Sequence, residues 1–470
     1  MPTGIHGRAS LCEHDMEDLN GYFASVSNDD TYRTPVSIKA CCNIKITVNE
    51  VEKHFQDLSK TAAGPCGIPF WVYKHSSKKL AYVVTLIFQE CLVSQVFPSL
   101  FKRELITPLA KKKSPTSVQD YRPIAVTDIL ARVFERIILC RYMPNIMKFC
   151  PLSQHGFRRG RSTVTALIDL HSKILKAIND TGSGFVVAID LTKAFDTIKH
   201  NAVIANAIKM EIDPTLVNML SDFLTNRTRA VCVGSKMSSW RTVNKGVGQG
   251  TVQGPLVFLI ATAFLRFNIP YVSYADDTTF IFDGNSSSEQ INLFICDVAI
   301  QYADLGLQLN ANKTKILPVN VKHCGQLALE TVEQTKILGV VLDRHFKVSA
   351  HVSDQIKAAS SSVYALQRLG RKLCLSVTDT EYLFKSVILS KLLYGVEFWW
   401  SMAAKKDKAL ISALIKRATR YRLVRDNLDL NKIVLYRRLA LFRRLLGVSL
   451  FSAFFPLSES LVDATLYPKS

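Results

Sequence analysis

Two apolar runs that each end on aspartate constrain the fold of this chain more than any other feature. The first run, residues 184–189, is followed by Asp190, and the second, residues 271–275, is followed by Asp276 and Asp277. A short, continuous apolar run of this kind suits a buried strand. A further strand-like run follows the aspartate pair directly, so we expect a tight hairpin with the pair at its tip. Two separate strands thus carry acids at their ends.

Three carboxylates at strand ends suit nucleotidyl transfer, provided that the two strands lie side by side. Such a reaction needs two divalent cations about 4 Å apart, which activate the attacking hydroxyl and stabilise the leaving pyrophosphate. Hard cations prefer oxygen ligands, and they relieve the repulsion among close carboxylates. We therefore predict that Asp190, Asp276 and Asp277 are catalytic and bind two Mg²⁺ ions, with Mn²⁺ as the alternative metal. Taken singly, each aspartate is more often a turn former or a surface charge.

The residues around these aspartates resemble the catalytic motifs of non-LTR (LINE-type) retrotransposon reverse transcriptases. Residues 185–200, with the sequence FVVAIDLTKAFDTIKH, resemble the first motif, and Tyr274–Asp277 matches the second. Three further segments match the same family in the same order, namely Tyr121–Ile124, Gln154–Thr163 and Gly246–Pro255. Five ordered matches are far more specific than any one of them.

The resemblance spans roughly residues 45 to 400. It implies an α+β fold of the right-hand polymerase type, with fingers, a palm that contains an antiparallel sheet, and a helical thumb. Apolar residues that recur every three to four positions beyond residue 350 also predict helices there. We predict four regions: a poorly ordered leader over 1–44, an N-terminal extension over 45–100, fingers and palm over 101–345, and a helical thumb with a basic C-terminal region over 346–470.

The resemblance also implies roles for single residues. Arg122 would contact the incoming triphosphate, because a guanidinium offers several donors with a fixed charge. Phe195 would lie under the sugar and exclude a 2′-hydroxyl. Gln249, Gly250 and Lys313 complete the implied nucleotide-binding set, with Lys313 near the leaving pyrophosphate. Each residue also has a purely structural alternative. Phe195 would be a core phenylalanine, Gln249 and Gly250 part of an ordinary glycine-rich turn, and Arg122 and Lys313 solvent-facing basic side chains.

Three arginines of the Gln154–Thr163 segment form the predicted template-binding set. Arg158, Arg159 and Arg161 flank glycines, which let a backbone approach closely, so these residues suit contact with phosphates more than reading of bases.

The charge balance favours a polyanionic partner. The chain has 59 Lys and Arg against 39 Asp and Glu, a net charge of +20, which is typical of nucleic-acid-binding proteins. Residues 401–470 contain 14 basic and 5 acidic side chains; they either follow a phosphate backbone or form a solvated helix surface. The most apolar stretches, 80–97 and 255–272, are interrupted by polar residues, so no membrane partner is expected.

The N-terminal residues and the cysteines bear on localisation. The first residues are acidic and do not have the pattern of a secretory signal, and the 11 cysteines lack the spacing of a zinc module. We expect reduced cysteines and an intracellular protein that acts at least partly in the nucleus.

These patterns predict an enzyme, an RNA-directed DNA polymerase that extends a DNA primer on an RNA template with dNTPs. Two departures from the family favour a degenerate or domesticated copy that only binds nucleic acid. Gly248 stands where the family usually has proline, which is expected to loosen that turn, and the connection over 258–272 is short. Another palm polymerase, an intron-type reverse transcriptase or an RNA-templated RNA polymerase, is a third hypothesis, although Phe195 and Tyr274–Asp277 argue against the RNA polymerase.

About 100 residues precede the predicted fingers motifs. This length is too short for the endonuclease domain that many such elements carry. We therefore expect a polymerase fragment, or a nicking activity supplied by a separate protein.

Overall fold

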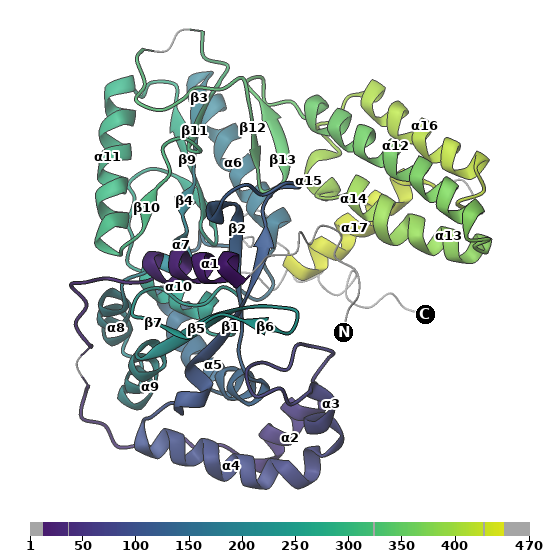
Figure 1. The fold of residues 1–470 in the computed structure, drawn as a ribbon. Coiled ribbons are helices and arrows are strands. Elements are labelled where there is room, and N and C mark those ends of the chain that lie inside the picture. Colours follow the sequence, from purple (N-terminus) through teal and green to yellow (C-terminus); the bar gives the residue numbers. More distant parts are fainter. Residues whose placement is uncertain (1–12, 36, 323–324, 426–427, 446–470) are drawn as a thin grey trace, which may run out of the picture. The chain divides into compact units, whose positions relative to one another are not determined.

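The computed structural model describes residues 13–35, 37–322, 325–425 and 428–445 (Figure 1). The chain forms two compact units, and each of them is built from separate stretches of sequence. The first unit comprises Met1–Pro151, Leu191–Arg266 and Asp297–Leu309, and the second comprises Leu152–Asp190, Phe267–Cys296 and Asn310–Ser470. The division predicted from the sequence, with limits at residues 44, 100 and 345, stays a prediction.

The first unit is built on a mixed sheet with the order β2–β1–β5–β6, in which β7 also pairs with β5. Strand β1 is antiparallel to β2 and parallel to β5. The strands of this sheet are β1 (Arg103–Ala110), β2 (Tyr121–Val126), β5 (Arg227–Val233), β6 (Lys236–Met237) and β7 (Arg241–Val243), and a separate pair joins β4 (Leu191–Thr192) to β10 (Gln308–Leu309). The helices are α1 (Glu13–Val26), α2 (Val48–Gln56), α3 (Phe70–His75), α4 (Ser77–Ser94), η1 (Ser99–Lys102), η2 (Val118–Asp120), α5 (Ile129–Phe149), α7 (Ala194–Thr197), α8 (His200–Lys209), α9 (Pro214–Leu224) and α10 (Gly254–Thr262).

Helix α1 corrects the prediction of a poorly ordered leader over 1–44. Met16, Leu19 and Phe23 recur at three-to-four-residue spacing, so they share one face of the helix. That face packs on Ile106 of β1 and Val231 of β5 in a small buried cluster. Burial of this apolar stripe stabilises a segment whose polar composition suggested disorder. Residues 1–12 of the predicted leader lie outside the described residues.

The second unit contains an antiparallel sheet with the order β11–β3–β9–β8. Its strands are β3 (Gly184–Ile189), β8 (Tyr271–Tyr274), β9 (Asp277–Asp283) and β11 (Lys315–Val319), and a separate hairpin joins β12 (Gln334–Ile337) to β13 (Val340–Asp343). The strands predicted at 184–189 and 271–275 and the strand-like run predicted after the aspartate pair are present as β3, β8 and β9. The antiparallel sheet agrees with the predicted palm.

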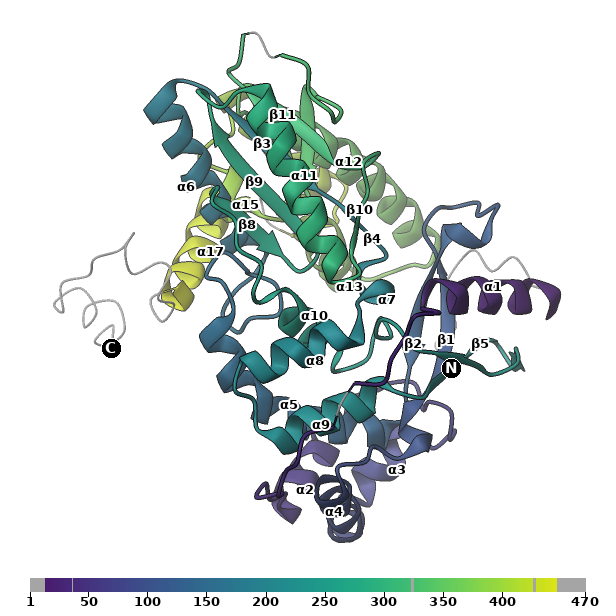
Figure 2. The same ribbon diagram turned by 90° about the vertical axis from the view of Figure 1, so that its left-hand side faces the viewer.

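The two faces of this sheet are covered by different helices (Figure 2). Side chains alternate between the faces of a strand. Ile281 therefore lies in the same buried cluster as Leu167 and Leu170 of α6 (Thr163–Thr181). Phe280 and Phe282 point the other way, and both rings contact Phe294 of α11 (Ser288–Asp304), with centroids 4.9 and 5.3 Å apart. The sheet is thus held between two helices.

Gly184 stands at the far end of the sheet from the aspartates. A Cβ atom at this position would lie 2.6 Å from the carbonyl oxygen of Phe282. Strands β3 and β9 approach each other here more closely than any side chain allows.

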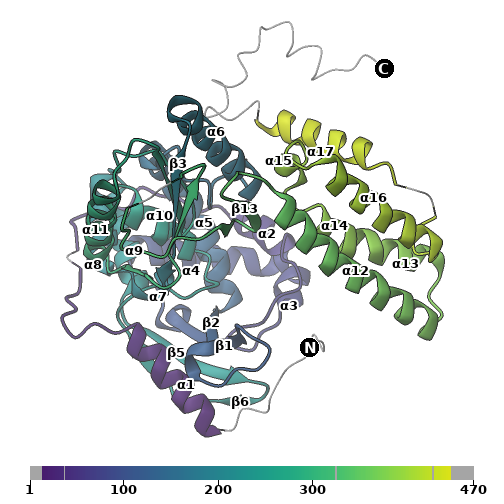
Figure 3. The same ribbon diagram turned by 90° about the horizontal axis from the view of Figure 1, so that it is seen from above.

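The predicted helices beyond residue 346 are present (Figure 3). Val352, Ala359, Val363 and Leu366 line the buried face of the longest of them, and Trp399 is fully buried in the same cluster. The described helices are α12 (Ser349–Lys372), α13 (Val377–Leu383), the π-helical turn η3 (Phe384–Leu389), α14 (Ser390–Leu392), α15 (Val396–Trp399), α16 (Lys405–Arg420) and α17 (Leu430–Leu445). The last part of the predicted basic region, 446–470, lies outside the described residues.

No helix among the described residues combines the length and the apolar character that a membrane-spanning helix needs.

A buried ion cluster in the first unit explains why glycine stands at position 248. Glu104 is fully buried and accepts hydrogen bonds from Arg227 at 2.7 and 3.1 Å, and Arg229 lies 3.6 Å from its second oxygen. A Cβ on Gly248 would lie 2.5 Å from Glu104 Oε1 and 2.8 Å from the Cβ of Ala125. Close packing therefore requires glycine here.

The turn that begins at Gly248 is held by hydrogen bonds, in contrast to the loosening expected from the sequence. The backbone N–H and the hydroxyl of Thr251 both donate to the Gly248 carbonyl, at 3.2 and 2.9 Å. Ala125 of β2 donates its N–H to the carbonyl of Gln249 at 2.7 Å. The turn is thereby fixed to the edge of the first sheet.

Glu135 of α5 is buried near this cluster and makes the stability of the protein depend on pH. Burial raises the pKa of Glu135 to about 7 despite the nearby Arg227. The Glu135 carboxyl group therefore binds a proton more tightly in the folded protein than in the unfolded chain. The protonated carboxyl group contributes stability below pH 4.5, and this contribution is lost as the pH rises from 4.5 to about 7. We expect Glu135→Gln to raise the free energy of unfolding above that of the wild type, and this gain should be larger at pH 8 than at pH 5 by on the order of 1–3 kcal/mol.

Thermal unfolding of both proteins at pH 5 and pH 8 measures this difference. Glu90→Gln, an exposed change on α4 in the same unit, is the matched control and should give equal shifts at both pH values. An equal gain for Glu135→Gln at the two pH values would contradict the expected proton linkage.

Candidate active site

The sheet register brings Asp190 next to Asp277. Ile189 of β3 pairs with Thr278 of β9. Asp190 directly follows the first of these residues and Asp277 directly precedes the second, so both aspartates stand at the same end of neighbouring antiparallel strands. Such strands lie about 4.8 Å apart. A separation of 87 residues in the sequence is thus reduced to adjacent strands.

Asp276 lies in the two-residue loop of the hairpin that joins β8 to β9, as predicted. Tyr274 pairs with Asp277 across the hairpin, so Ala275 and Asp276 form the loop. Ala275 has φ +58°, a left-handed conformation that costs a residue with a side chain roughly 1–2 kcal/mol. The surrounding contacts must therefore stabilise this loop.

The electrostatics of the three aspartates suit a cation. Partial desolvation, the larger cause, and the negative charges of Asp276 and Asp190 together raise the pKa of Asp277 to about 6, although the residue is exposed. Repulsion of this kind shows that the three carboxylates interact, and a divalent cation relieves it. Three carboxylates are also the donor set that hard cations prefer.

The described residues contain no cluster of three His, Cys, Asp or Glu side chains already gathered in metal-binding geometry. The donor types at the strand ends fit Mg²⁺, and the assignment of Asp190, Asp276 and Asp277 as metal ligands stays a prediction.

Lys313 lies beside the first aspartate. Its Nζ is 3.6 Å from Asp190 Oδ2, and both side chains are well exposed. An exposed ion pair of this kind contributes little to stability. The neighbouring backbone is better fixed, because Asn310 donates its N–H to the Asp190 carbonyl and Asp190 donates its own to the Thr314 hydroxyl. The lysine is therefore close to the candidate metal site and is able to move.

Two of the predicted template-binding arginines also stabilise their own loop. Arg158 donates to the carbonyl of Gln154 at 3.4 Å, and Arg161 donates to the carbonyl of Leu152. Arg159 is exposed. The contact of these three arginines with template phosphates stays a prediction.

The predicted nucleotide-binding residues of the first unit gather around strand β2. Gly250 has φ +109°, and a Cβ atom on it would lie 2.8 Å from the Ala125 carbonyl oxygen, so this turn requires glycine. Gln249 donates its side-chain amide to Asp196 at 2.9 Å. Arg122 is exposed on β2, opposite Leu109. The exposed guanidinium is accessible to a ligand.

Phe195 lies in the short helix α7 and is half-buried, with its ring 5.5 Å from that of Phe258 in α10. Val247 donates its backbone N–H to the carbonyl of Phe195, so the segment around Phe195 and the Gln249 turn are joined. The contact with Phe258 agrees with a packing role, and the exclusion of a 2′-hydroxyl by this ring stays a prediction.

Sequence reasoning gave no role to Asp196, Gln154 or Gly156. Burial raises the pKa of Asp196 to about 6, against the nearby Arg229, and one of its oxygens accepts from Gln249. Gln154 and Gly156 contact the aspartate hairpin directly. All three residues stand in segments that matched the family, and their place within those motifs was the available signal.

An antiparallel palm sheet with carboxylates on neighbouring strand ends, together with a C-terminal set of helices, defines a right-hand polymerase fold. The family described as reverse transcriptase (RNA-dependent DNA polymerase) matches residues 110–342. Residues 110–342 therefore form a reverse transcriptase domain, and the curated relatives that the chain resembles are RNA-directed DNA polymerases of mobile elements.

Two of these relatives are from Drosophila melanogaster. The probable RNA-directed DNA polymerase from transposon BS is 28% identical over 72% of this chain and 40% of its own length. The RNA-directed DNA polymerase from mobile element jockey is 27% identical over 72% of this chain and 39% of its own length. The chain thus spans about two fifths of the curated relatives that it matches. Among solved structures, the telomerase from Candida tropicalis in complex with a fragment of telomeric RNA has a TM-score of 0.42 and 10% identity, over 81% of this chain and 67% of that one.

Proposed function

We propose that the chain is an RNA-directed DNA polymerase that extends a primer 3′-hydroxyl with dNTPs by a two-metal-ion mechanism, as part of a retrotransposon-type element. The observation that carries this proposal is the pairing of Ile189 with Thr278, which puts Asp190 and Asp277 on adjacent strand ends. The reverse transcriptase match over residues 110–342 supports it.

In this proposal, Asp190, Asp276 and Asp277 hold two Mg²⁺ ions. When bound, the ions supply Lewis-acid activation of the primer hydroxyl and stabilisation of the leaving pyrophosphate. The sheet register positions Asp190 beside Asp277, and the hairpin carries Asp276 into the loop next to them. Lys313, within 3.6 Å of Asp190, stabilises the charge that develops on the leaving group.

The remaining site residues bind the substrates. Arg122 and the Gln249–Gly250 turn bind the nucleotide, and the ring of Phe195 excludes a 2′-hydroxyl by steric overlap. Arg158, Arg159 and Arg161 bind phosphates of the RNA template, which matches the net charge of +20.

The chain's partners in this proposal are an RNA template, a DNA primer and dNTPs. An endonuclease from another protein or another part of the element supplies the nick that creates the primer end. The protein works inside the cell, and its polymerisation takes place at least partly in the nucleus, where the target DNA lies.

A primer-extension assay with a DNA primer on an RNA template tests the proposal. The wild-type chain should incorporate dNTPs with Mg²⁺, should stop when the metal is chelated, and should use ribonucleotides poorly. No extension by a folded wild-type protein, together with tight and salt-sensitive RNA binding, would favour a copy that only binds nucleic acid.

The short connection over 258–272 was the main support for such a degenerate copy. Helix α10 ends at Thr262 and strand β8 begins at Tyr271. Within the connection, the ring of Phe267 packs edge-on against Tyr271 and Phe280, with centroids 5.1 and 4.9 Å apart. A connection that contributes to the sheet's aromatic core argues for an intact palm and therefore for the polymerase.

A further inference from the structure

The segment Ser153–Gly156 acts as a short extra strand beside the aspartate hairpin. Ser273 of β8 donates its N–H to the Ser153 carbonyl at 2.9 Å, and His155 donates its N–H to the Ser273 carbonyl at 2.7 Å. These two bonds form a parallel bridge between Gln154 and Ser273. The free edge of β8 is therefore covered over the residues that lead to the hairpin loop.

Gln154 contacts the backbone of the hairpin loop with both ends of its side-chain amide. Its Oε1 accepts the N–H of Ala275 at 3.0 Å, and its Nε2 lies 3.4 Å from the Ala275 carbonyl, to which it donates. The same Oε1 also accepts the N–H of Gly156 at 2.8 Å. The side chain is 6% exposed. Buried in this way, the amide satisfies the backbone groups of the residue that has the left-handed conformation.

Gly156 lets the two segments approach each other. A Cβ atom on Gly156 would lie 2.3 Å from the backbone nitrogen of Ala275 and 3.0 Å from its Cα. These are backbone atoms, so no rotation of a side chain would relieve the overlap. Any residue other than glycine would displace the hairpin loop.

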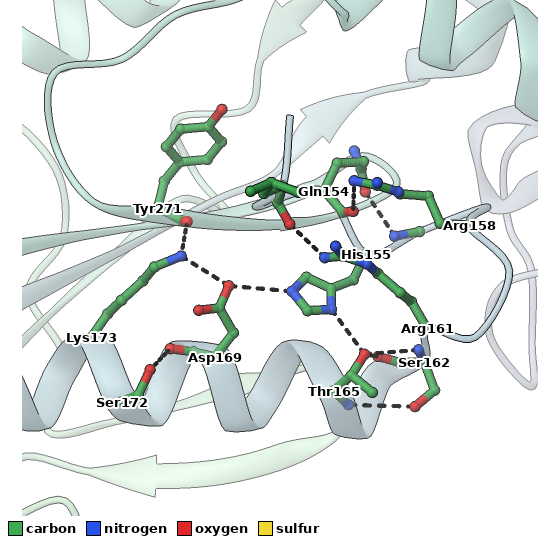
Figure 4. A network of polar contacts seen from close by, with 12 residues as sticks. Gln154, His155, Arg158, Arg161, Ser162, Thr165, Asp169, Ser172, Lys173 and Tyr271 are labelled. Atoms are coloured by element: carbon green, nitrogen blue, oxygen red, sulfur yellow. Dashed lines mark hydrogen bonds and ion pairs between the residues drawn. The ribbon is translucent and has the colours of Figure 1, made fainter. Parts of the chain in front are cut away.

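A buried network anchors this segment to helix α6 (Figure 4). His155 is 1% exposed; its Nδ1 is 2.8 Å from the Thr165 hydroxyl and its Nε2 is 3.2 Å from Asp169 Oδ2. Burial lowers the pKa of His155, so the neutral ring directs its Nε2–H toward the carboxylate. Lys173 donates to the same carboxylate at 2.8 Å and to the carbonyl of Tyr271, at the start of β8, at 2.9 Å. The network therefore holds β8 at one end and the segment that contacts the loop at the other.

We propose that Gln154 and Gly156 are positioning residues for the metal-binding carboxylates. The Gln154 amide and the bare face of Gly156 fix the backbone of Ala275, and this contact sets where Asp276 and Asp277 stand relative to Asp190. The effect of these residues on catalysis rests on the proposed polymerase function. Their effect on the position of the hairpin loop rests on the contacts alone.

Hydrogen exchange tests the structural part without reference to activity. Gln154→Met keeps the length of the side chain and removes the acceptor, so the amide of Ala275 should exchange about tenfold faster in peptides that cover residues 271–280. Gln154→Glu keeps the oxygen that accepts this N–H and should retain most of the protection. Gln301→Met, which removes an exposed glutamine contact on α11, is the matched control. Equal exchange in the wild type and Gln154→Met overturns the proposal, and so does equal loss of protection in the Met and Glu variants.

Mn²⁺ binding and steady-state kinetics test the catalytic part. For Gln154→Met and Gly156→Ala we expect the Mn²⁺ concentration at half-saturation, followed by paramagnetic resonance, to rise about tenfold. The kcat of primer extension should fall by a similar factor while the KM for primer–template is unchanged. A rise in KM with unchanged kcat and metal binding contradicts a positioning role. An inactive wild type contradicts the proposed polymerase instead, and the exchange result still decides whether Gln154 fixes the hairpin.

Discussion

Asp277→Asn is expected to lower the kcat of primer extension on the order of 10³-fold, because on the proposed function it removes one charged metal ligand and several kcal/mol of charge stabilisation in the transition state. The amide is nearly the same size as the carboxylate, so the hairpin should fold as before. The pKa of Asp277, raised to about 6 by desolvation and by Asp276 and Asp190, adds a structural expectation. Removal of one of three repelling charges should leave the metal-free protein equally stable or slightly more stable.

Asp283→Asn is the matched control for this variant. Asp283 ends the same strand, on the side remote from the loop, and its Oδ1 caps the turn through Asn285 and Ser286. The amide oxygen of asparagine can accept the same bonds, so primer extension should be unchanged. Equal rates for Asp277→Asn and the wild type in single-turnover extension would exclude Asp277 as a metal ligand.

Gly248→Ala is expected to lower the free energy of unfolding by about 2–4 kcal/mol. The added methyl group would overlap Glu104 Oε1 at 2.5 Å, and a carboxylate displaced from Arg227 leaves buried charges without their partners. Proline, which the resemblance favours at this position, carries the same Cβ atom and should be at least as destabilising in this chain. Urea unfolding followed by circular dichroism measures the change.

Gly21→Ala is the control for this prediction. Gly21 lies within helix α1, and the nearest atom to its added Cβ is 4.0 Å away, on a side chain. Alanine in an open helical position should stabilise the helix by up to about 1 kcal/mol. If Gly248→Ala were as stable as the wild type, Glu104 would have room to move, and the tight packing described for this turn would be refuted.

The sequence predicted those parts of the fold that local patterns determine. Apolar runs ending at Asp190 and before Asp276 predicted two strands and a hairpin, because the continuity and length of an apolar run are properties of a few consecutive residues. The family motifs then implied that the two strands pair. The same reasoning was wrong about the order of residues 13–26, because the partner surface that stabilises α1 comes from strands β1 and β5 far along the chain.

The contacts that no local pattern contains were not predicted. The bond between Gln154 and Ala275 joins residues 121 positions apart, and the clash that requires glycine at position 248 depends on Glu104 of β1, which lies outside all of the matched segments. In the sequence, a glycine in place of proline indicates only backbone freedom. Whether glycine is required at such a position depends on which side chain occupies the space that a Cβ atom would fill.

On the proposed function, Gly184 shows how the chain can lose polymerase activity while its diagnostic residues remain. The aspartates and Gly184 stand at opposite ends of strand β3, roughly 20 Å apart at 3.3 Å per residue. A side chain at Gly184 would overlap the carbonyl oxygen of Phe282 and push β3 away from β9, and the pairing of these two strands is what places Asp190 beside Asp277. A gene copy under no selection can therefore lose its activity through a substitution at the end of the sheet remote from the aspartates, and its sequence would still contain all three of them.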